Sequence, residues 1–267
     1  SALRFSLFVF RFSIFVPMRI TRHLRDLGES TQRTVLTIGN FDGVHLAHQK
    51  LLCKVVHAAR SLRAVPTAVT FEPHPVKLLS PEHAPKLLMP LERKARLIEN
   101  LGIELLVVLP FTKELARFSP LEFVREILVR QLHVVSVHVG PNFRFGYRQS
   151  GDTEILVELA RQEGFRLDVL PILTVRGEQV SSTRIRELLS VGRVDLAARL
   201  LGRPFSVYGS IAAGFGVGHK HTVPTLNLAP IEEQHPKIGV YVTRTRLGEA
   251  RHDSVTNVGH KPTFGHH

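Results

Sequence analysis

Short apolar runs alternate with helical patterns between residues 34 and 189, and no other feature of the sequence constrains the fold as strongly. Five runs of four to seven residues, rich in valine, leucine and isoleucine, predict strands over 35–39, 65–71, 105–109, 134–139 and 167–170. Because these runs are almost continuously apolar, we expect both faces of each strand to be buried. Helical spacing between them predicts helices over 45–60, 91–101, 121–132 and 153–163. The alternating order therefore predicts an α/β fold with a parallel sheet, right-handed crossovers and helices on both faces.

The character of the sequence changes near Gly202. Helical spacing over 183–189 and 195–201 ends there, and Arg203-Pro204 opens a stretch with frequent glycines and alternating runs such as 205–212 and 240–246. This pattern favours an antiparallel sheet or barrel. A chain of 267 residues fits two domains at about 100–200 residues each. We predict a Rossmann-like nucleotide-binding domain over 18–202 and an antiparallel domain over 203–267.

The first residues of the chain differ from the rest. Residues 1–17 are rich in Phe, Leu and Ile, but Arg11 interrupts the apolar run. The uninterrupted stretches fall short of the roughly 20 residues that a membrane span needs, and no Ala-x-Ala-like cleavage site follows. We expect translation of the functional protein to begin at Met18, residues 1–17 to be a non-native extension, and the protein to have no membrane partner.

Cysteine usage and charge restrict the partners. The single cysteine, Cys53, excludes an intramolecular disulfide and a zinc site built on thiolate pairs, and it favours a reducing cytoplasm. We expect Cys53 to be a small core residue on the apolar side of its helix. The net charge of +12 favours an anionic partner, but the basic residues are scattered rather than gathered in a stripe. A nucleic-acid-binding protein is therefore kept only as an alternative. The oligomeric state is left open, and the basic residues Arg93, Lys94 and Arg96 are expected to form a solvated helix face.

The first motif with chemical content is GNFDGVHLAHQ, over residues 39–49. It places a turn bounded by Gly39 and Gly43 at the carboxyl end of a buried strand, where open α/β sheets bind their ligands. His45 and His48 are three residues apart and share one face of the following helix. Free backbone amides at a helix amino terminus attract phosphate, and two imidazoles add donors that can stabilise charge on a pentavalent phosphorus. The alternative is a tight turn with incidental surface histidines.

This motif resembles the GNFDGVHxGHQ signature of the bifunctional riboflavin kinase/FAD synthetase family, whose first domain is an HxGH nucleotidyltransferase. Four further segments agree with that family in the same order. They are TFEPHP at 70–75, VGPNFRFG at 139–146, VSSTRIR at 180–186, and PTLN at 224–227 together with NVGHKPTF at 257–264. The resemblance spans most of the chain from 35 to 264 and implies an enzyme that acts on ATP, FMN and riboflavin.

The resemblance implies adenylyl transfer from ATP to FMN, with release of pyrophosphate. His45 and His48 would bind the triphosphate and stabilise its transition state, and Asn142 would contact phosphates. The remaining nucleotide contacts would come from the first loop, Gly39, Asn40, Phe41 and Asp42, and from the hydroxyls and guanidinium of Ser181, Ser182, Thr183 and Arg186. Two structural alternatives stay open, a polar turn packed by Phe143 and Phe145 around Asn142, and a Ser-Thr helix cap.

One residue departs from the signature of the first domain. Ala47 stands where the family has the glycine of HxGH, so a methyl group lies where backbone approaches phosphate. Alanine favours a helix interior over glycine by about 1 kcal/mol. We therefore expect the fold to survive and the substitution to act on the rate of adenylyl transfer.

The second domain resembles riboflavin kinase, which transfers the γ-phosphoryl group of ATP to riboflavin. Thr225 and Asn227 match the family's PTAN motif and would hold Mg²⁺ through oxygen atoms. Gly214 and Gly218 would turn backbone amides toward phosphate. The family's catalytic Glu follows the PTF segment, and this chain ends before it, so we expect an incomplete barrel without riboflavin kinase activity. A second enzyme hypothesis keeps the nucleotidyltransferase domain and changes the acceptor to another phosphorylated compound, although single-domain enzymes of that kind carry no PTxN region.

Overall fold

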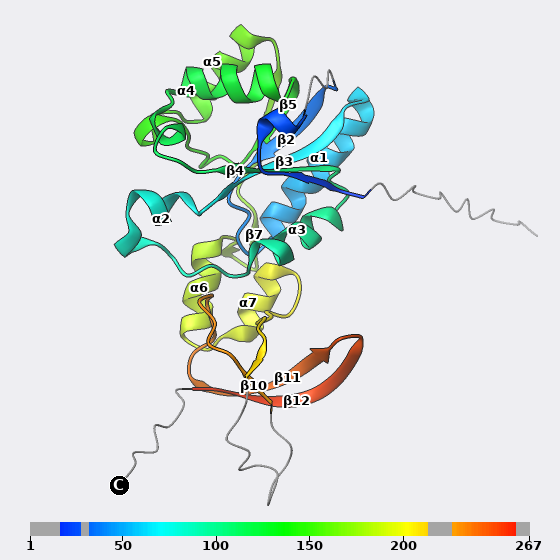
Figure 1. Ribbon diagram of the computed structural model, residues 1–267, viewed down its shortest axis with the longest axis vertical. Helices are drawn as coiled ribbons and strands as arrows, with labels where there is room; N and C mark the ends of the chain where they lie inside the picture. The colour runs from blue at the N-terminus through cyan, green and yellow to red at the C-terminus, as the bar shows by residue number, and fades with distance from the viewer. Residues whose placement is uncertain (1–16, 28–31, 213–225, 260–267) are drawn as a thin grey trace, which may run out of the picture.

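A computed structural model of the chain describes residues 17–27, 32–212 and 226–259. Six parallel strands form its main sheet, in the order β1-β4-β3-β2-β5-β6 (Figure 1). Their bounds are β1 Arg19–Thr21, β2 Thr34–Ile38, β3 Val65–Glu72, β4 Leu105–Pro110, β5 Val134–Val139 and β6 Arg166–Val169. The chain runs outward from β2 to β3 and β4, and returns on the other side of β2 to form β5 and β6. The sheet is therefore doubly wound, and its direction of winding reverses between β2 and β5.

The predicted α/β class and its five strands are confirmed. Every residue of β2 is buried, and β3, β4 and β5 are buried over most of their length, as their apolar runs predict. Strand β6 differs, because all four of its residues are partly or fully exposed. It lies at the edge of the sheet and has a neighbour on one side only. Strand β1 was not predicted, since its three residues are too few to show a pattern.

Helices cover both faces of the sheet (Figure 1). Helices α1 and α3 enclose one core cluster, which includes Leu52 and Ile98, and the segment from α4 to α5 encloses the other, which includes Leu128 and Leu156. The α-helices of this part are α1 Leu46–Leu62, α2 Pro75–Leu79, α3 Leu91–Glu99, α4 Pro120–Glu122 and α5 Thr153–Glu163. Short 3-10 turns occur at Leu24–Leu27, Pro81–His83, Leu115–Arg117 and Tyr147–Gln149.

Two predictions about these helices were wrong. Residues predicted as one α-helix over 121–132 wind mostly as a π-helix, Phe123–Gln131, and the Leu132 amide donates to the Ile127 carbonyl at 3.1 Å. Cys53 is exposed, because the buried stripe of α1 runs through Leu52, Val55 and Ala59 and turns position 53 outward. The spacing of apolar residues identified both helices but does not reveal the π winding. The stripe through Leu52, Val55 and Ala59 does place position 53 away from the buried face, so the expectation for Cys53 rested on its residue type alone.

A helical pair joins the sheet to the last part of the chain. Helices α6 Ser182–Ser190 and α7 Val194–Leu201 follow the small hairpin of β7 Thr174–Val175 and β8 Glu178–Gln179. The pair forms a third core cluster, in which Ile185, Leu189 and Leu200 pack with Leu88.

The last described part is antiparallel, as predicted. Strand β9 Ile211–Ala212 pairs with β10 Asn227–Leu228, and β11 Gly239–Leu247 forms a hairpin with β12 Ala250–Val258. Of the strand expected over 205–212, only β9 forms. The strands described after Gly202 make two separate two-stranded sheets and no closed barrel.

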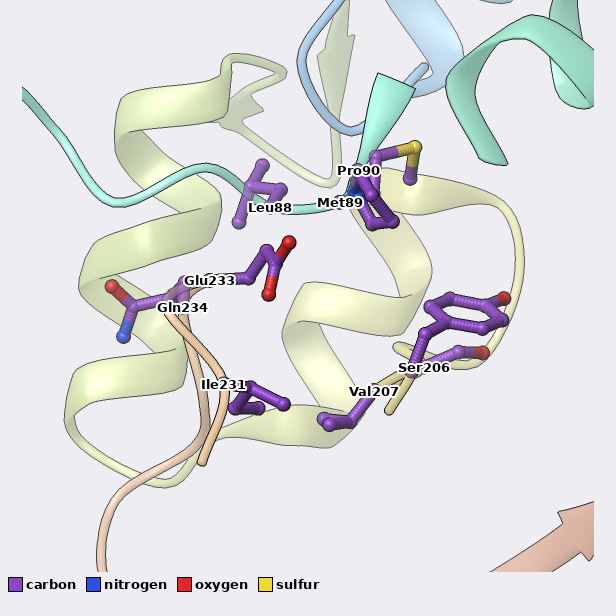
Figure 2. A pocket seen from close by; sticks show the side chains of 9 residues that line it. Leu88, Met89, Pro90, Ser206, Val207, Ile231, Glu233 and Gln234 are labelled. Carbon is purple, nitrogen blue, oxygen red and sulfur yellow. The ribbon is translucent and has the colours of Figure 1, made fainter. Parts of the chain in front are cut away.

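The antiparallel part packs against the helical pair and the segment before α3. The Gln234 amide donates to the Leu87 carbonyl at 2.7 Å, and the Lys237 amide donates to the Leu189 carbonyl at 2.8 Å. A gap of only about 10 Å³, room for a single water, is left in this junction. Figure 2 shows its lining, which is Leu88, Met89, Pro90, Ser206, Val207, Tyr208, Ile231, Glu233 and Gln234. No helix in the described ranges has the length and apolar character of a membrane span.

Candidate functional site

A cleft of about 250 Å³ opens at the carboxyl ends of β2 and β5, where the winding of the sheet reverses. Open α/β sheets bind their ligands at this position. Predicted site residues that line the cleft are Gly39, Phe41, His45, His48, Asn142 and Ser181. Further lining residues are Ile38, Ala47, Lys50, Leu51, Gly140, Pro141, Phe143, Leu170, Pro171, Ile172, Leu173, Gln179 and Val180.

His45 and His48 lie together at the amino terminus of α1. His45 is the N-cap residue, and its Nδ1 accepts a hydrogen bond from the His48 amide at 3.3 Å. The two rings are stacked, with centroids 3.6 Å apart and planes 15° from parallel. The ring of Phe41 meets His48 edge-on at 5.3 Å. The His48 Nδ1 is buried and has no hydrogen-bond partner among the described residues.

Burial keeps this histidine pair uncharged at neutral pH. Removal from water lowers the pKa of His45 to about 4, and the positive charges of Arg203 and Arg186 act in the same direction. Burial also lowers the pKa of His48 well below its ordinary value, and the neighbouring His45 and Lys94 lower it further. Each neutral imidazole has one N–H donor, which can bond to a phosphate oxygen.

The loop that carries His45 has an unusual backbone. Phe41, Gly43 and Val44 all have positive φ angles, of 48°, 83° and 39°. Gly43 is required here, because a Cβ atom would lie 2.7 Å from Leu88 Cδ1. Val44 is β-branched, and such residues rarely adopt this conformation. The surrounding contacts therefore hold the loop in a shape that its sequence alone disfavours.

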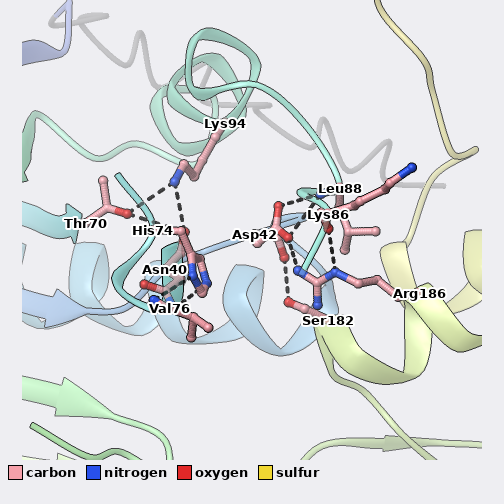
Figure 3. A network of polar contacts seen from close by, with 10 residues as sticks. All are labelled: Asn40, Asp42, Thr70, His74, Val76, Lys86, Leu88, Lys94, Ser182 and Arg186. Atoms are coloured by element: carbon pink, nitrogen blue, oxygen red, sulfur yellow. Dashed lines mark hydrogen bonds and ion pairs between the residues drawn. The ribbon is translucent and has the colours of Figure 1, made fainter. Parts of the chain in front are cut away.

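Asp42 anchors this loop through the buried network of Figure 3. Its carboxylate accepts from the Leu88 amide, at 2.9 and 3.1 Å for its two oxygens, and forms an ion pair with Arg186. Arg186 Nε donates to the Lys86 carbonyl at 2.7 Å, and the Ser182 hydroxyl donates to the Asp42 carbonyl at 2.7 Å. Burial raises the pKa of Asp42, whereas Arg186, the Leu88 amide and Lys94 lower it. The network ties α6 to the loop.

The structure divides the residues expected around the nucleotide into two groups. Arg186 and Ser182 make their contacts with the Asp42 loop and the segment before α3, and do not line the cleft. Thr183 is exposed outside the cleft lining. Ser181 lines the cleft and also caps α6 by accepting from the Arg184 amide at 3.1 Å. Asn142 is exposed at the cleft edge, in the loop after β5.

Asn40 belongs to a second polar cluster beside the loop. Its side-chain amide contacts His74 Nε2 at 3.0 Å, and its carbonyl accepts from Lys94 Nζ at 3.0 Å. Lys94 Nζ also donates to the Thr70 hydroxyl at 3.3 Å (Figure 3). Burial lowers the pKa of Lys94, and burial lowers the pKa of His74 to about 4.

Arg93, Lys94 and Arg96 were expected to form a solvated helix face, and the position of Lys94 contradicts this prediction. Lys94 is buried, while Arg96 is exposed and Arg93 lies partly buried with its guanidinium 5.1 Å from the ring of Tyr208. The helical spacing carried the signal, because position 94 shares a face with the buried residues Ala95 and Ile98. The charge of Lys94 favours exposure, and its position on the helix outweighs that preference.

Of the candidate residues in the second domain, the structure describes only Asn227. Gly214, Gly218 and Thr225 lie outside the described residues. Asn227 is exposed in β10, paired with Ala212 of β9.

A parallel sheet with a cleft at its switch point, a helix amino terminus facing that cleft and neutral imidazoles on that terminus together define a nucleotide-binding α/β protein. Family models agree with this class. One described as FAD synthetase matches residues 27–184, and one described as riboflavin kinase matches residues 201–267.

Curated proteins that are similar to this chain are named for both a riboflavin kinase and an FMN adenylyltransferase. The bifunctional riboflavin kinase/FMN adenylyltransferase of Pseudomonas fluorescens is 35% identical over 246 residues, covering 92% of this chain and 79% of its own length. The protein of the same name from Escherichia coli K12 is 32% identical over 248 residues, with the same coverage of 92% and 79%. A crystal structure described as a macrolide-efflux protein from Streptococcus pneumoniae superposes with a TM-score of 0.82 at 25% identity, covering 93% of this chain and 81% of the other. This chain belongs to the bifunctional riboflavin kinase/FMN adenylyltransferase family.

Proposed function

We propose that the cleft between β2 and β5 is where this chain makes FAD, by transfer of the adenylyl group of ATP to FMN. A phosphate oxygen of FMN attacks the α-phosphorus of ATP, the bond from that phosphorus to the bridging oxygen breaks, and pyrophosphate leaves. The observation that carries this assignment to the cleft is the stacked pair His45 and His48 at the amino terminus of α1, inside the cleft.

The cleft offers several neutral donors to a polyphosphate. The amino-terminal amides of α1 point toward incoming anions, and the two imidazoles contribute N–H groups beside them. The Ser181 hydroxyl accepts from the Arg184 amide, which leaves its proton free to donate. Asn142 supplies an amide from the opposite loop. Donors held at fixed positions in the cleft would stabilise the charge that develops at phosphorus, without a covalent intermediate.

In this proposal Arg186 stabilises the loop that contains Asp42. Its side chain is 16% exposed, and its guanidinium is engaged with Asp42 and the Lys86 carbonyl. Contact with the β- or γ-phosphate, the role that the family motif implies, requires these bonds to open. In the arrangement described, Arg186 instead holds the loop that presents His45.

The second half of the proposal concerns residues 201–267, which match riboflavin kinase. A riboflavin kinase transfers the γ-phosphoryl group of ATP to riboflavin, and its product FMN is the acceptor of the adenylyl reaction. We propose that Thr225 and Asn227 would bind Mg²⁺ through their side-chain oxygen atoms. An exposed amide oxygen such as that of Asn227 is chemically suited to a hard cation that keeps part of its water shell.

An acceptor comparison tests the proposed function. The chain is incubated with ATP labelled at the α-phosphate, Mg²⁺ and one of three acceptors, FMN, riboflavin or 4′-phosphopantetheine. We expect FMN-dependent appearance of FAD and an equal amount of pyrophosphate. Labelled product with 4′-phosphopantetheine and none with FMN would replace FMN by another phosphorylated acceptor, and absence of pyrophosphate with every acceptor would overturn adenylyl transfer.

A further inference from the structure

The strained backbone before His45 has two carbonyls that point toward the end of α7. These are the carbonyls of Gly43 and Val44, the residues with φ angles of 83° and 39°. Arg203 Nη1 donates to the Val44 carbonyl at 3.0 Å, and its Nη2 donates to the Gly43 carbonyl. The two ends of the first bond are 159 residues apart in the sequence. A single guanidinium therefore fixes both peptide groups that precede the N-cap histidine.

Gln49 completes this arrangement from the other side. Its Nε2 donates to the Val44 carbonyl at 2.8 Å and to the Leu201 carbonyl at 2.9 Å. Arg203 Nη1 also donates to the Leu201 carbonyl, at 3.1 Å. The two side chains thus share the same two acceptors, and we refer to them as the Arg203–Gln49 clamp. The clamp joins the last residue of α7 to the residue before His45.

The charge of Arg203 has no counterion in this arrangement. Its bonds go to carbonyls, and no carboxylate pairs with it among the described residues. Burial lowers the pKa of Arg203 and the neighbouring Arg93 lowers it further, whereas Tyr208 raises it. Arg203 is half-buried, so its guanidinium loses part of its hydration, and its bonds to the three carbonyls replace that hydration. A forked donor is also needed, because an ammonium group presents its protons from one atom and cannot span three carbonyls in this way.

Gly202 shows how closely α7 approaches α1. It has a φ of 71°, and a Cβ atom there would lie 2.6 Å from Leu46 Cδ2. Leu46 is the first residue of α1 and follows His45 directly. The end of α7 is therefore seated against the turn that presents the histidine pair.

We propose that Arg203 is a positioning residue for adenylyl transfer, which fixes His45 and the amino terminus of α1 through the carbonyls of Gly43 and Val44. The inference rests on the proposed function of the cleft. Arg203 lies within the residues that match riboflavin kinase, so a residue of one matched region holds the phosphate site of the other. It acts through the loop and makes no contact with the reacting atoms.

Kinetics of three variants test this proposal in the full chain. Arg203→Met removes the donors, Arg203→Lys keeps the charge without the fork, and Gln49→Met removes the other half of the clamp. We expect kcat for FAD formation to fall about 10- to 100-fold in Arg203→Met and at least about 5-fold in the other two, while the KM for ATP stays within about threefold. Arg199→Met is the control, because Arg199 is an exposed residue of α7 and should keep the kcat of the unchanged chain.

A second measurement separates positioning from general destabilisation. Histidine labelled with ¹³C reports the titration of His45 by NMR. Arg203→Lys keeps the charge, so a changed His45 pKa in that folded variant reports a displaced ring, whereas general destabilisation leaves the pKa of the folded protein unchanged. Unchanged kcat in the folded Arg203→Met protein, or equal losses in Arg199→Met, would overturn the positioning role. If the unchanged chain forms FAD and Arg203→Met matches it, only this inference fails, whereas failure of the unchanged chain to form FAD removes the proposed function itself.

Discussion

The imidazole rings of His45 and His48 lie face to face, 3.6 Å between centroids, at the first turn of α1. Stacked imidazoles at this distance repel each other strongly when both are protonated. Burial lowers the pKa of each, to about 4 for His45. The pair is therefore neutral near pH 7, and in the proposed reaction an arriving polyphosphate would bring the negative charge that favours protonation.

Acid should destabilise the fold through His45. Its pKa falls from 6.5 to about 4 on folding, so the stabilisation is present above pH 6.5 and is lost as the pH falls toward 4. Between pH 7 and pH 5 this loss amounts to roughly 2 kcal/mol. We expect urea unfolding to show that extra loss in the unchanged chain compared with His45→Asn, which keeps an N-cap acceptor but does not titrate. Parallel stability curves for the two proteins would contradict the neutral burial of His45.

Removal of the second imidazole should abolish most adenylyl transfer. We expect His48→Ala to lower kcat for FAD formation by about 100-fold or more, because one donor to the developing charge is lost. Coupled detection of pyrophosphate gives the rate. His57→Ala is the matched control, since His57 lies exposed on the same helix and away from the cleft. Comparable rates in His48→Ala and the control would rule out a part for His48 in the reaction.

Ala47 offers a substitution toward the family signature. It lines the cleft between the two histidines, where we expect its methyl group to hinder the approach of phosphate. We expect Ala47→Gly to raise the rate of adenylyl transfer at low ATP by lowering the KM for ATP several-fold, and to cost up to about 1 kcal/mol of stability. Ala58→Gly, toward the other end of α1, should cost a similar amount of stability without any change in the KM. The idea is wrong if both variants leave the KM for ATP unaltered.

The buried ion pair of Asp42 and Arg186 should carry far more stability than an exposed one. Asp42→Ala leaves a guanidinium 16% exposed and the Leu88 amide without an acceptor, so we expect a loss of about 3–5 kcal/mol in urea unfolding. Asp253→Ala, which breaks the exposed pair with Arg244, should cost less than about 1 kcal/mol. Similar losses in the two variants would show that the Asp42 network does not anchor the loop.

The central sheet could be predicted because its signal is local. Buried strands β2 to β5 are apolar runs, and the spacing of apolar residues marks the intervening helices whatever their partners are. Strand β1 has no such run, and it exists because Arg19–Thr21 pairs with β4. The π-helical winding of Phe123–Gln131 leaves the same buried face as an α-helix, so periodicity does not reveal it.

The sequence predicts only those residues of the candidate site that lie within short local motifs. The position of His45 and His48 on one helix turn follows from their spacing, and motif order adds Asn142 and Ser181. The contacts of Arg203 join the end of α7 to a loop 159 residues earlier, and no local pattern contains that meeting. Lys94 is different. Its position on α3 indicates burial, whereas its charge favours the opposite interpretation.

The outward turn of Cys53 gives the chain a natural attachment point for a reporter. It is the one cysteine of the sequence, it is exposed, and it lies on the helix whose first turn carries the histidine pair. A maleimide fluorophore added to the unaltered chain would label this thiol alone. Its emission would then report the arrival of a nucleotide at the first turn of the same helix, in real time and without mutagenesis.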